Sequence, residues 1–439
     1  MPTTRRTFLR AAALAGGATC IAALRDDAVE RALALDHLAG GRTPEDLAAD
    51  ETFWFDVQQA FMLDRNILNL NNGGVSPSPR VVHESYKRHL DFANNATAWV
   101  LWQVQDPEVE PVRRRLAEHF GCDGEEIAIT RNASESLQTC LLGIDLQRGD
   151  EVLTTNQDYP RMLTTLKQRA AREGIVLKTF SMPVPAKSMD ELAQGFESQI
   201  TPRTRLILMS HIVNITGQIY PVRRVVETAR KRNIPVVVDG AHAFAHFQFK
   251  QADLNCDMYG VSLHKWLTAP VGTGLLYVRR DRIKDIWPLM AAPQSLRGDI
   301  RKYEEIGTHP AANRLAIAEA LTFFEGIGPA RKEARLRYLR DRWAKRLMQD
   351  KRIRLLTNLD PAMSCGIGLV QIEGIETLAL SGHLWGKHRI MVSPIVHDEF
   401  QGIRITPNVY STLGEIDTFC RAMEDVIARG LPAVPGASK

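Results

Sequence analysis

The sequence has few cysteines, and none of them stand at the spacing of a metal site or a redox pair. The six are Cys20, Cys122, Cys140, Cys256, Cys365 and Cys420, with no CxxC motif among them. Loss of an N-terminal leader would leave five, an odd number that does not suit a disulfide framework. The sequence therefore predicts neither a disulfide framework nor a bound metal.

The sequence also lacks a block of positive charge and a long hydrophobic run. Its formal net charge of +4 is spread over 439 residues, which does not point to a nucleic-acid partner. The apolar run over residues 11–24 is shorter than the ~20 residues that cross a bilayer. Hydrophobic residues at 44% and charged residues at 24% are typical of a globular, enzyme-sized protein.

Residues 3–27 resemble a twin-arginine export signal. Arg5 and Arg6 are followed by Phe8 and Leu9, then by the apolar run and the charged residues 25–27. This pattern predicts a leader over residues 1–30, recognition by the twin-arginine export machinery, and a periplasmic or exported protein that folds in the cytoplasm. The alternative interpretation is an alanine-rich helix with incidental arginines.

The remainder alternates between helical and strand patterns. Helices are expected over residues 80–94 and 109–120 and after Ser134, and strands over 127–130, 151–154, 176–180, 206–210 and 235–238. Such alternation predicts a parallel sheet with crossover helices, which binds ligands beyond the carboxyl ends of its strands. Because single cores stop growing near ~250–300 residues, a second domain is expected.

A different pattern follows residue 310. An amphipathic helical stretch covers residues 311–350, and its charged part, 331–345, is predicted to face solvent. Strands over 367–372, 390–394 and 402–406 and a final helix from Leu413 then predict a small α+β domain.

The chemistry centres on an acid and a lysine. Asp239 ends the apolar strand 235–238, and Lys265 follows it by 26 positions after another strand-like run. A lysine amine forms a covalent bond with a carbonyl carbon, and an acid beside a pyridine nitrogen keeps that nitrogen protonated. Together they indicate pyridoxal 5'-phosphate (PLP) chemistry. Taken singly, Lys265 could be a surface lysine beside Trp266, and Asp239 could be a helix cap.

Further segments carry a family resemblance. Residues 129–135, 156–160, 210–217, 306–308 and 402–407 join the acid and lysine segments in one order. This arrangement resembles the class V aminotransferase family of fold type I PLP-dependent enzymes, from Asn69 to Ile416. Isopenicillin N epimerases and cysteine desulfurases are among its members.

The resemblance implies an α/β architecture with a mostly parallel seven-stranded sheet. The large PLP-binding domain is expected over residues 71–310 and the smaller α+β domain over 311–430. Residues 31–70 are expected to pack on the small domain. A homodimer with shared active sites is also implied.

The resemblance assigns a role to residues in each segment. Lys265 and Asp239 are the expected catalytic pair, and Arg404 is expected to bind a substrate carboxylate, which its planar guanidinium suits. The other expected cofactor contacts are Ala133, Ser134, Tyr159, Asn214, His242, Ser262, His264 and Thr308, the last reaching the partner subunit's site. His246 and Tyr410 stay open as additional pocket residues.

The implied activity is aminotransfer or epimerisation at the Cα of a small amino-acid substrate. A PLP-dependent lyase or cysteine desulfurase is an alternative, but Cys365 leads into a buried strand and is interpreted as structural. A PLP-fold binding protein without catalysis is the other alternative, and retention of the lysine, the acid and the arginine argues against it.

Overall fold

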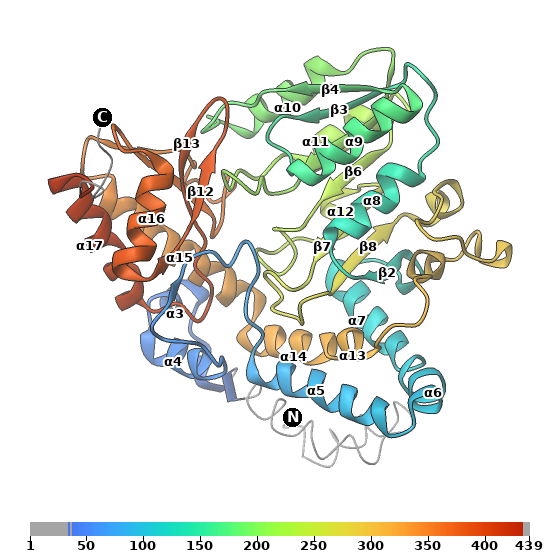
Figure 1. Ribbon diagram of the computed structural model, residues 1–439, viewed down its shortest axis with the longest axis horizontal. Coiled ribbons are helices and arrows are strands. Elements are labelled where there is room, and N and C mark those ends of the chain that lie inside the picture. The colour runs from blue at the N-terminus through green and yellow to red at the C-terminus, as the bar shows by residue number, and fades with distance from the viewer. Residues whose placement is uncertain (1–33, 36, 433–439) are drawn as a thin grey trace.

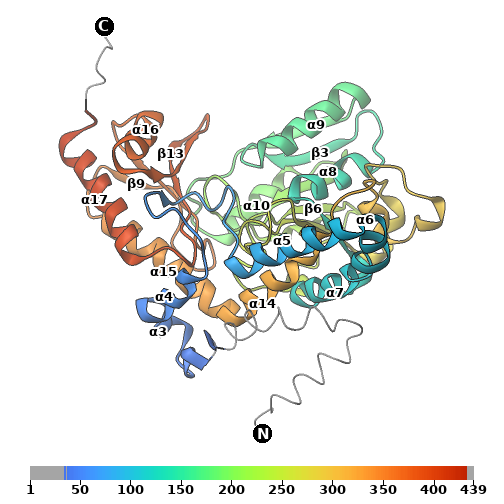
Figure 2. The same ribbon diagram turned by 60° about the horizontal axis from the view of Figure 1, so that its bottom comes forward.

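The computed structural model describes residues 34, 35 and 37–432, which form a large α/β domain and a smaller domain beside it (Figure 1). The leader predicted over residues 1–30 lies outside the described residues. The two domains meet along the N-terminal segment and helix α15 (Pro329–Leu347), as Figure 2 also shows.

The large domain is built on a sheet of seven strands in the order β2-β8-β7-β6-β5-β3-β4. The strands are β2 (Ile127–Thr130), β3 (Glu151–Thr155), β4 (Val176–Phe180), β5 (Thr204–Ser210), β6 (Val236–Asp239), β7 (Met258–Ser262) and β8 (Gly274–Val278). β8 runs antiparallel to both of its neighbours, and the other pairings are parallel. The mostly parallel seven-stranded sheet is confirmed.

Helices cover both faces of this sheet, so its strands are apolar on both sides. Leu206 and Leu208 of β5 point to a core shared with α8 (Ala133–Gly143) and α9 (Pro160–Glu173). Ile207 and Met209 point to the opposite core, which also holds buried residues of α7 (Val109–Phe120), α10 (Met189–Gln199) and α11 (Val222–Arg230).

The small domain contains an antiparallel sheet in the order β12-β13-β10-β9. Its strands are β9 (Ile353–Leu355), β10 (Gly368–Ile372), β12 (Ser393–Val396) and β13 (Gln401–Ile405). One core joins this sheet to α15, α16 (Thr377–His388) and α17 (Leu413–Arg429). The strand predicted over 390–394 is divided, because β11 (Ile390–Met391) pairs instead with β1 (Leu68–Asn69).

The domain boundary expected at residue 311 differs from the structure. Helices α13 (Ala312–Leu315) and α14 (Ile317–Ile327) bury Ile317 and Leu321 in the large-domain core, against α5 (Arg80–Asn95) and α7. Helix α14 ends at Gly328, whose φ of 87° suits glycine, and Pro329 then starts α15, which still contributes Leu336 to that core. The hydrophobic period predicts helices here, but it does not tell which core each helix enters.

The expectation that residues 331–345 face solvent is wrong for three cations of α15. Lys332, Arg335 and Arg340 are almost completely buried. Arg335 donates hydrogen bonds to the carbonyl oxygens of Ala48 at 2.9 Å and Ser411 at 3.0 Å. It therefore joins α15 to helix α3 (Pro44–Ala48) and to the loop after β13. A charged pattern alone does not reveal such carbonyl partners.

The substitution Arg335→Ala is expected to lower the free energy of unfolding by about 3 kcal/mol. Two buried carbonyl groups lose their donor, and the partly exposed Glu51 loses its counter-ion. Urea denaturation followed by circular dichroism measures the change. The matched control on the same helix is Lys345→Ala, whose side chain is 68% exposed and whose loss is expected to change stability by less than about 0.5 kcal/mol. Equal denaturation midpoints for the two variants would contradict the role of Arg335.

Candidate active site

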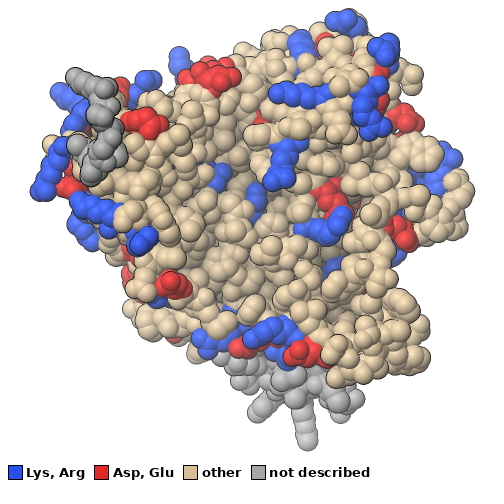
Figure 3. Space-filling view, viewed as in Figure 1, with Lys and Arg blue, Asp and Glu red and all other residues tan. Residues whose placement is uncertain are grey.

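The expected site residues come together at the carboxyl ends of the central strands. Asp239 is the last residue of β6 and is paired in register with Ser210 at the end of β5. Ser262 ends the neighbouring strand β7, three residues before Lys265. Because these strands are parallel, their carboxyl ends lie at one edge of the sheet. Figure 3 shows basic side chains on the surface between the two domains.

Asp239 is a buried acid with little to stabilise its charge. Its Oδ1 accepts one hydrogen bond, from the backbone N–H of Ala241 at 3.0 Å. Burial raises the pKa of the Asp239 carboxyl to about 6, and the buried Asp158 nearby acts in the same direction. Among the residues that the structure describes, no basic group forms an ion pair with Asp239. A cationic ring nitrogen would supply that missing partner.

Lys265 is a half-buried amine next to a histidine. Its Nζ lies 3.0 Å from Nε2 of His242. Burial lowers the pKa of the Lys265 amine to about 8, although the negative charge of Asp239 opposes this effect. A lysine with a lowered pKa has a larger fraction of neutral amine near neutral pH, which makes it a better nucleophile.

An anion-binding corner forms where α8 begins. The backbone N–H of Ala133, the first residue of α8, donates to Oγ of Ser262 at 3.0 Å. Ser134 follows in the same first turn, and Asn132 caps the helix by accepting from the N–H of Glu135 at 2.9 Å. A helix N-terminus with two hydroxyl groups suits a phosphate. The structure thus brings together residues predicted from two segments, Ala133 and Ser134 from one and Ser262 from the other.

Arg404 is a buried guanidinium without an acid partner. Its side chain is 6% exposed, and it donates to the carbonyl oxygen of Asn214 at 2.9 Å and to Oδ1 of Asn71 at 2.8 Å. In the described part of the chain no carboxylate lies within ion-pair distance of it, and its Nε has no hydrogen-bond partner. Burial lowers the pKa of Arg404 to about 10. A buried charge in this state favours an incoming carboxylate.

Two other expected contacts lie beside Arg404 and His242. Tyr159 immediately precedes α9, and it raises the pKa of Arg404, against the effect of burial. Its hydroxyl oxygen accepts from Nε of Arg161 at 3.2 Å. Asn214 leaves its Oδ1 buried with no hydrogen-bond partner among the described residues. Its side chain is thus available to a bound molecule.

His264 and Thr308 are less buried than Asp239, His242 and Arg404. His264 is half-buried and donates from Nδ1 to the carbonyl oxygen of Thr273 at 3.2 Å. Thr308 is exposed, and its expected contact with a partner subunit stays a prediction.

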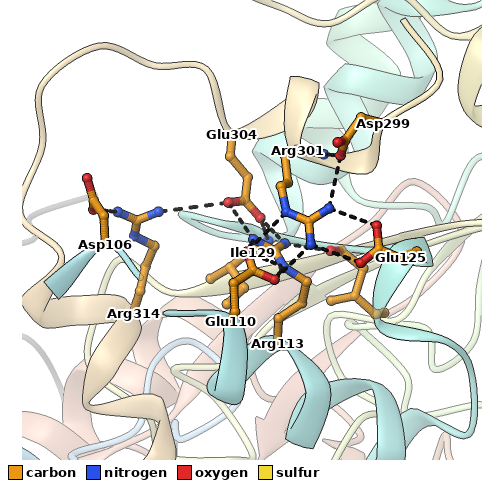
Figure 4. A network of polar contacts seen from close by, with 10 residues as sticks. Asp106, Glu110, Arg113, Glu125, Ile129, Asp299, Arg301, Glu304 and Arg314 are labelled. Atoms are coloured by element: carbon orange, nitrogen blue, oxygen red, sulfur yellow. Dashed lines mark hydrogen bonds and ion pairs between the residues drawn. The ribbon is translucent and has the colours of Figure 1, made fainter. Parts of the chain in front are cut away.

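A network of ion pairs fixes the segment that leads to Thr308 (Figure 4). Glu304, at the end of the short helix η5 (Ile300–Glu304), accepts from the backbone N–H of Ile129 at 2.6 Å and pairs with Arg113. Arg113 also donates to the carbonyl oxygen of Ile127 at 2.7 Å. The network therefore attaches η5 to the edge strand β2, which leads into the anion-binding corner.

Sequence reasoning missed two polar residues of the site. Asn71 belongs to an Asn/Gly-rich turn over residues 69–74, a composition that indicates only a loop. Asp158 is buried and accepts from the hydroxyl groups of Thr154, Thr155 and Ser210 at 2.7–2.8 Å. An acid directly before Tyr159 was the available signal for it. Tyr410, which was left open, bonds to the same turn, with Asn69 donating to its hydroxyl oxygen at 3.1 Å.

This fold and site define a PLP-dependent enzyme of fold type I. The chain belongs to the class V aminotransferase family, whose sequence profile matches residues 68–416. An isopenicillin N epimerase from Streptomyces clavuligerus is 30% identical over 397 residues, which cover 84% of this chain and 98% of that protein.

Solved structures show the same fold. The apo structure of a cysteine desulfurase from Thermococcus onnurineus NA1 matches with a TM-score of 0.74 at 22% identity, covering 85% of this chain and 98% of that one. The structure of C-DES with glycine covalently linked to its PLP cofactor matches with a TM-score of 0.73 at 22% identity, covering 82% and 97%.

The residues present fit PLP. Lys265 would hold its aldehyde carbon, Asp239 its ring nitrogen, and the start of α8 its phosphate. Asn214 and His242 would serve the phenolic oxygen. When bound, PLP supplies an electron sink for a carbanion at the substrate Cα. The buried Asp239, which accepts one hydrogen bond and has no ion pair among the described residues, is the observation that supports this fit.

The substitution Asp239→Asn is expected to stabilise the cofactor-free protein above pH 6. The folded-state pKa of this acid, about 6, lies above its ordinary value of 3.8, so its ionised form destabilises the folded state. That cost is complete above pH 6 and disappears as the pH falls toward 4. A displacement of roughly two pH units corresponds to up to about 3 kcal/mol.

Urea denaturation of the cofactor-free wild type and variant between pH 4 and 8 measures this difference. The matched control is Asp398→Asn, the same substitution at an exposed position on the turn after β12. A gap between wild type and Asp239→Asn that does not grow with pH would contradict the assignment.

Proposed function

We propose that the protein removes the proton from the Cα of an amino acid, or of a metabolite that contains one, and that epimerisation is the outcome. Aminotransfer is the close alternative within the same proposal. One observation carries it: Arg404 is buried without an acid partner and lies close enough to Lys265 to lower the pKa of that amine. A carboxylate bound at Arg404 holds the substrate beside the amine.

Arg404, Lys265 and Asp239 have separate roles in the proposed reaction. Arg404 pairs with the substrate α-carboxylate in a bidentate geometry. Lys265 would act as the general base for the Cα proton, because its pKa of about 8 is close to neutral pH. Asp239 keeps the ring nitrogen protonated, and burial of the site excludes water.

Epimerisation is favoured over aminotransfer by the similarity to isopenicillin N epimerase. That similarity extends over 98% of the Streptomyces protein, so it includes both domains and every segment of the site. The reaction depends on which atom receives the returning proton. A proton returned to Cα from the opposite face would give an epimer, whereas release of a keto acid would mark aminotransfer.

A cysteine desulfurase is the second candidate, because a similar solved structure carries that name. Desulfuration needs an accessible thiolate to accept sulfur. Cys365 is completely buried, its Sγ donates to the carbonyl oxygen of His246 at 3.7 Å, and burial raises the pKa of its thiol to about 12. Each other cysteine in the described chain is buried or half-buried. This candidate is therefore ranked below epimerisation.

Incubating the PLP-loaded protein with a panel of amino acids in deuterated water tests the proposal. Cα exchange and change of configuration without keto acid are expected. Keto acid release instead indicates aminotransfer, and release of ammonia or sulfide indicates a lyase or desulfurase. Lys265→Ala is the control that abolishes exchange. A fully loaded wild type that exchanges no Cα proton would overturn the proposal in favour of a binding protein.

In the same assay Arg404→Lys is expected to raise KM about 10- to 100-fold with a smaller change in kcat. A lysine lacks the planar fork that pairs with a carboxylate, and the loss of one charge-assisted hydrogen bond corresponds to this factor. Amino-acid amides, which have no carboxylate, serve as the matched substrates. An equal KM change for acids and amides would contradict the carboxylate role of Arg404.

We also propose export by the twin-arginine machinery, on the basis of the leader. Among the described residues no helix has both the length and the apolar composition to cross a membrane. Replacement of Arg5 and Arg6 by lysine is expected to retain the precursor in the cytoplasm, as cell fractionation and immunoblotting would show. Arg10→Lys, also in the leader, is the control. Unchanged export of the double variant would exclude this route.

A further inference from the structure

Two histidines and a tryptophan lie directly behind the cofactor-binding lysine. His242, His246 and Trp266 are 3%, 1% and 0% exposed. The ring of His246 stacks on Trp266, with centroids 3.6 Å apart and planes 11° from parallel. The ring of His242 lies between this pair and Lys265, since it contacts Trp266 through one nitrogen and Lys265 through the other.

The contacts of His242 determine which nitrogen carries its proton. Nε1 of Trp266 lies 3.4 Å from Nδ1 of His242. An indole N–H is a donor only, so Nδ1 of His242 must be the acceptor. In a neutral imidazole the remaining proton is then on Nε2, which faces Nζ of Lys265 at 3.0 Å.

His246 is held in the opposite tautomer. Its Nδ1 lies 2.7 Å from the carbonyl oxygen of His242, which only accepts, and its Nε2 accepts from the N–H of Gly366 at 2.8 Å. Both nitrogens are therefore committed, which fixes the plane of the ring. Because Trp266 stacks on this ring, the direction of its indole N–H is fixed as well.

Both histidines are neutral. Burial lowers the pKa of His242 well below its usual value, and the positive charge of Lys265, whenever its amine is protonated, and that of Arg404 lower this pKa further. Burial has the same effect on the pKa of His246. No carboxylate in the described chain pairs with either ring.

We propose that Trp266, oriented by His246, fixes His242 in the neutral tautomer that carries its proton on Nε2. His242 is then a positioning residue that presents a hydrogen-bond donor to Nζ of Lys265, and to the phenolic oxygen of PLP when the cofactor is bound. It is not a base for the substrate proton. This inference concerns the lysine and the cofactor and holds whichever reaction follows.

The donor role has a consequence for Lys265. An N–H that points at Nζ is satisfied only by a neutral amine, since an ammonium group has no lone pair. The tautomer of His242 therefore favours the nucleophilic form of the lysine before the cofactor binds. The amide N–H of a glutamine at this position would donate to Nζ in the same way, whereas a side chain that only accepts hydrogen bonds would not.

Nuclear magnetic resonance of protein labelled with 15N-histidine tests the tautomers directly. His242 is expected to show a protonated Nε2 and a bare Nδ1, and His246 the reverse, both in the cofactor-free protein and after loading with PLP. Signals that disappear in His242→Gln identify the first residue. Protonation of His242 at Nδ1, or at both nitrogens, near neutral pH overturns the proposal.

Trp266→Phe separates the hydrogen bond from the packing. Phenylalanine keeps an aromatic ring for the stack on His246 but has no N–H, so His242 is expected to become a mixture of tautomers while His246 keeps its own. An unchanged His242 spectrum in a folded variant overturns the role of Trp266. If the variant does not fold, the wild-type tautomers still decide.

The visible absorption of the PLP-loaded protein gives a second readout. Trp266→Phe removes the contact that fixes the His242 donor beside the phenolic oxygen. This variant is expected to raise the pH midpoint of the visible band by up to about 1 pH unit, the size of one charge-assisted hydrogen bond. The control is Trp54→Phe, which removes the N–H of another buried tryptophan, bonded to the carbonyl oxygen of Leu47 at 2.7 Å. Trp54→Phe is expected to keep the wild-type midpoint. The proposal fails if Trp266→Phe also keeps it.

Discussion

The buried charge of Arg404 is the constraint on which the rest of the structure depends. A guanidinium in a protein interior is costly unless its donors are satisfied, and this one has two neutral oxygen partners in place of an acid. Asn71 comes from the N-terminal turn and Asn214 from the loop after β5, while Arg404 itself is on β13 of the small domain. The charge is thus supported from three parts of the chain. Among the described residues no acid compensates it, which is the feature on which the proposed carboxylate site rests.

Helix α15 applies the same principle to the architecture. Lys332 donates to the carbonyl oxygen of Trp266, Arg335 to that of Ser411, and Arg337 to that of Ser364. Each cation donates to a backbone carbonyl of a different segment, and the first of these segments contains Lys265. Arg335 and Arg337 also pair with Glu51 and Glu333. Lys332 forms no ion pair in the described chain, so its position depends on close packing around its amine. Helix α15 therefore fixes the relative positions of the loop that contains Lys265, the N-terminal helix α3 and the loop after β13.

Local patterns predicted the elements well and their tertiary setting poorly. The strand over 127–130 and the helix over 109–120 were predicted with the bounds that the structure shows, because turn residues delimit short apolar or amphipathic runs. Lys265 and Asp239 were found because the chemistry of the two residues is specific and their order is informative. In contrast, the destination of helices α13 and α14 and the burial of Arg335 depend on partners distant in sequence. The stack of His246 on Trp266 is of the same kind, since no spacing rule connects a ring to the residue that orients it.

The route of the chain at Gly328 and Pro329 matters to anyone who would recombine this protein with a relative. A crossover placed there would exchange the small domain together with all of α15. Yet Lys332 lies four residues beyond it and ends on the Trp266 carbonyl of the domain left behind. A chimaera built at this junction inherits a lysine from one parent and its acceptor from the other. Compatible parents are those in which the loop that contains Lys265 and Trp266 places the Trp266 carbonyl oxygen in the same position, whatever their overall sequence identity.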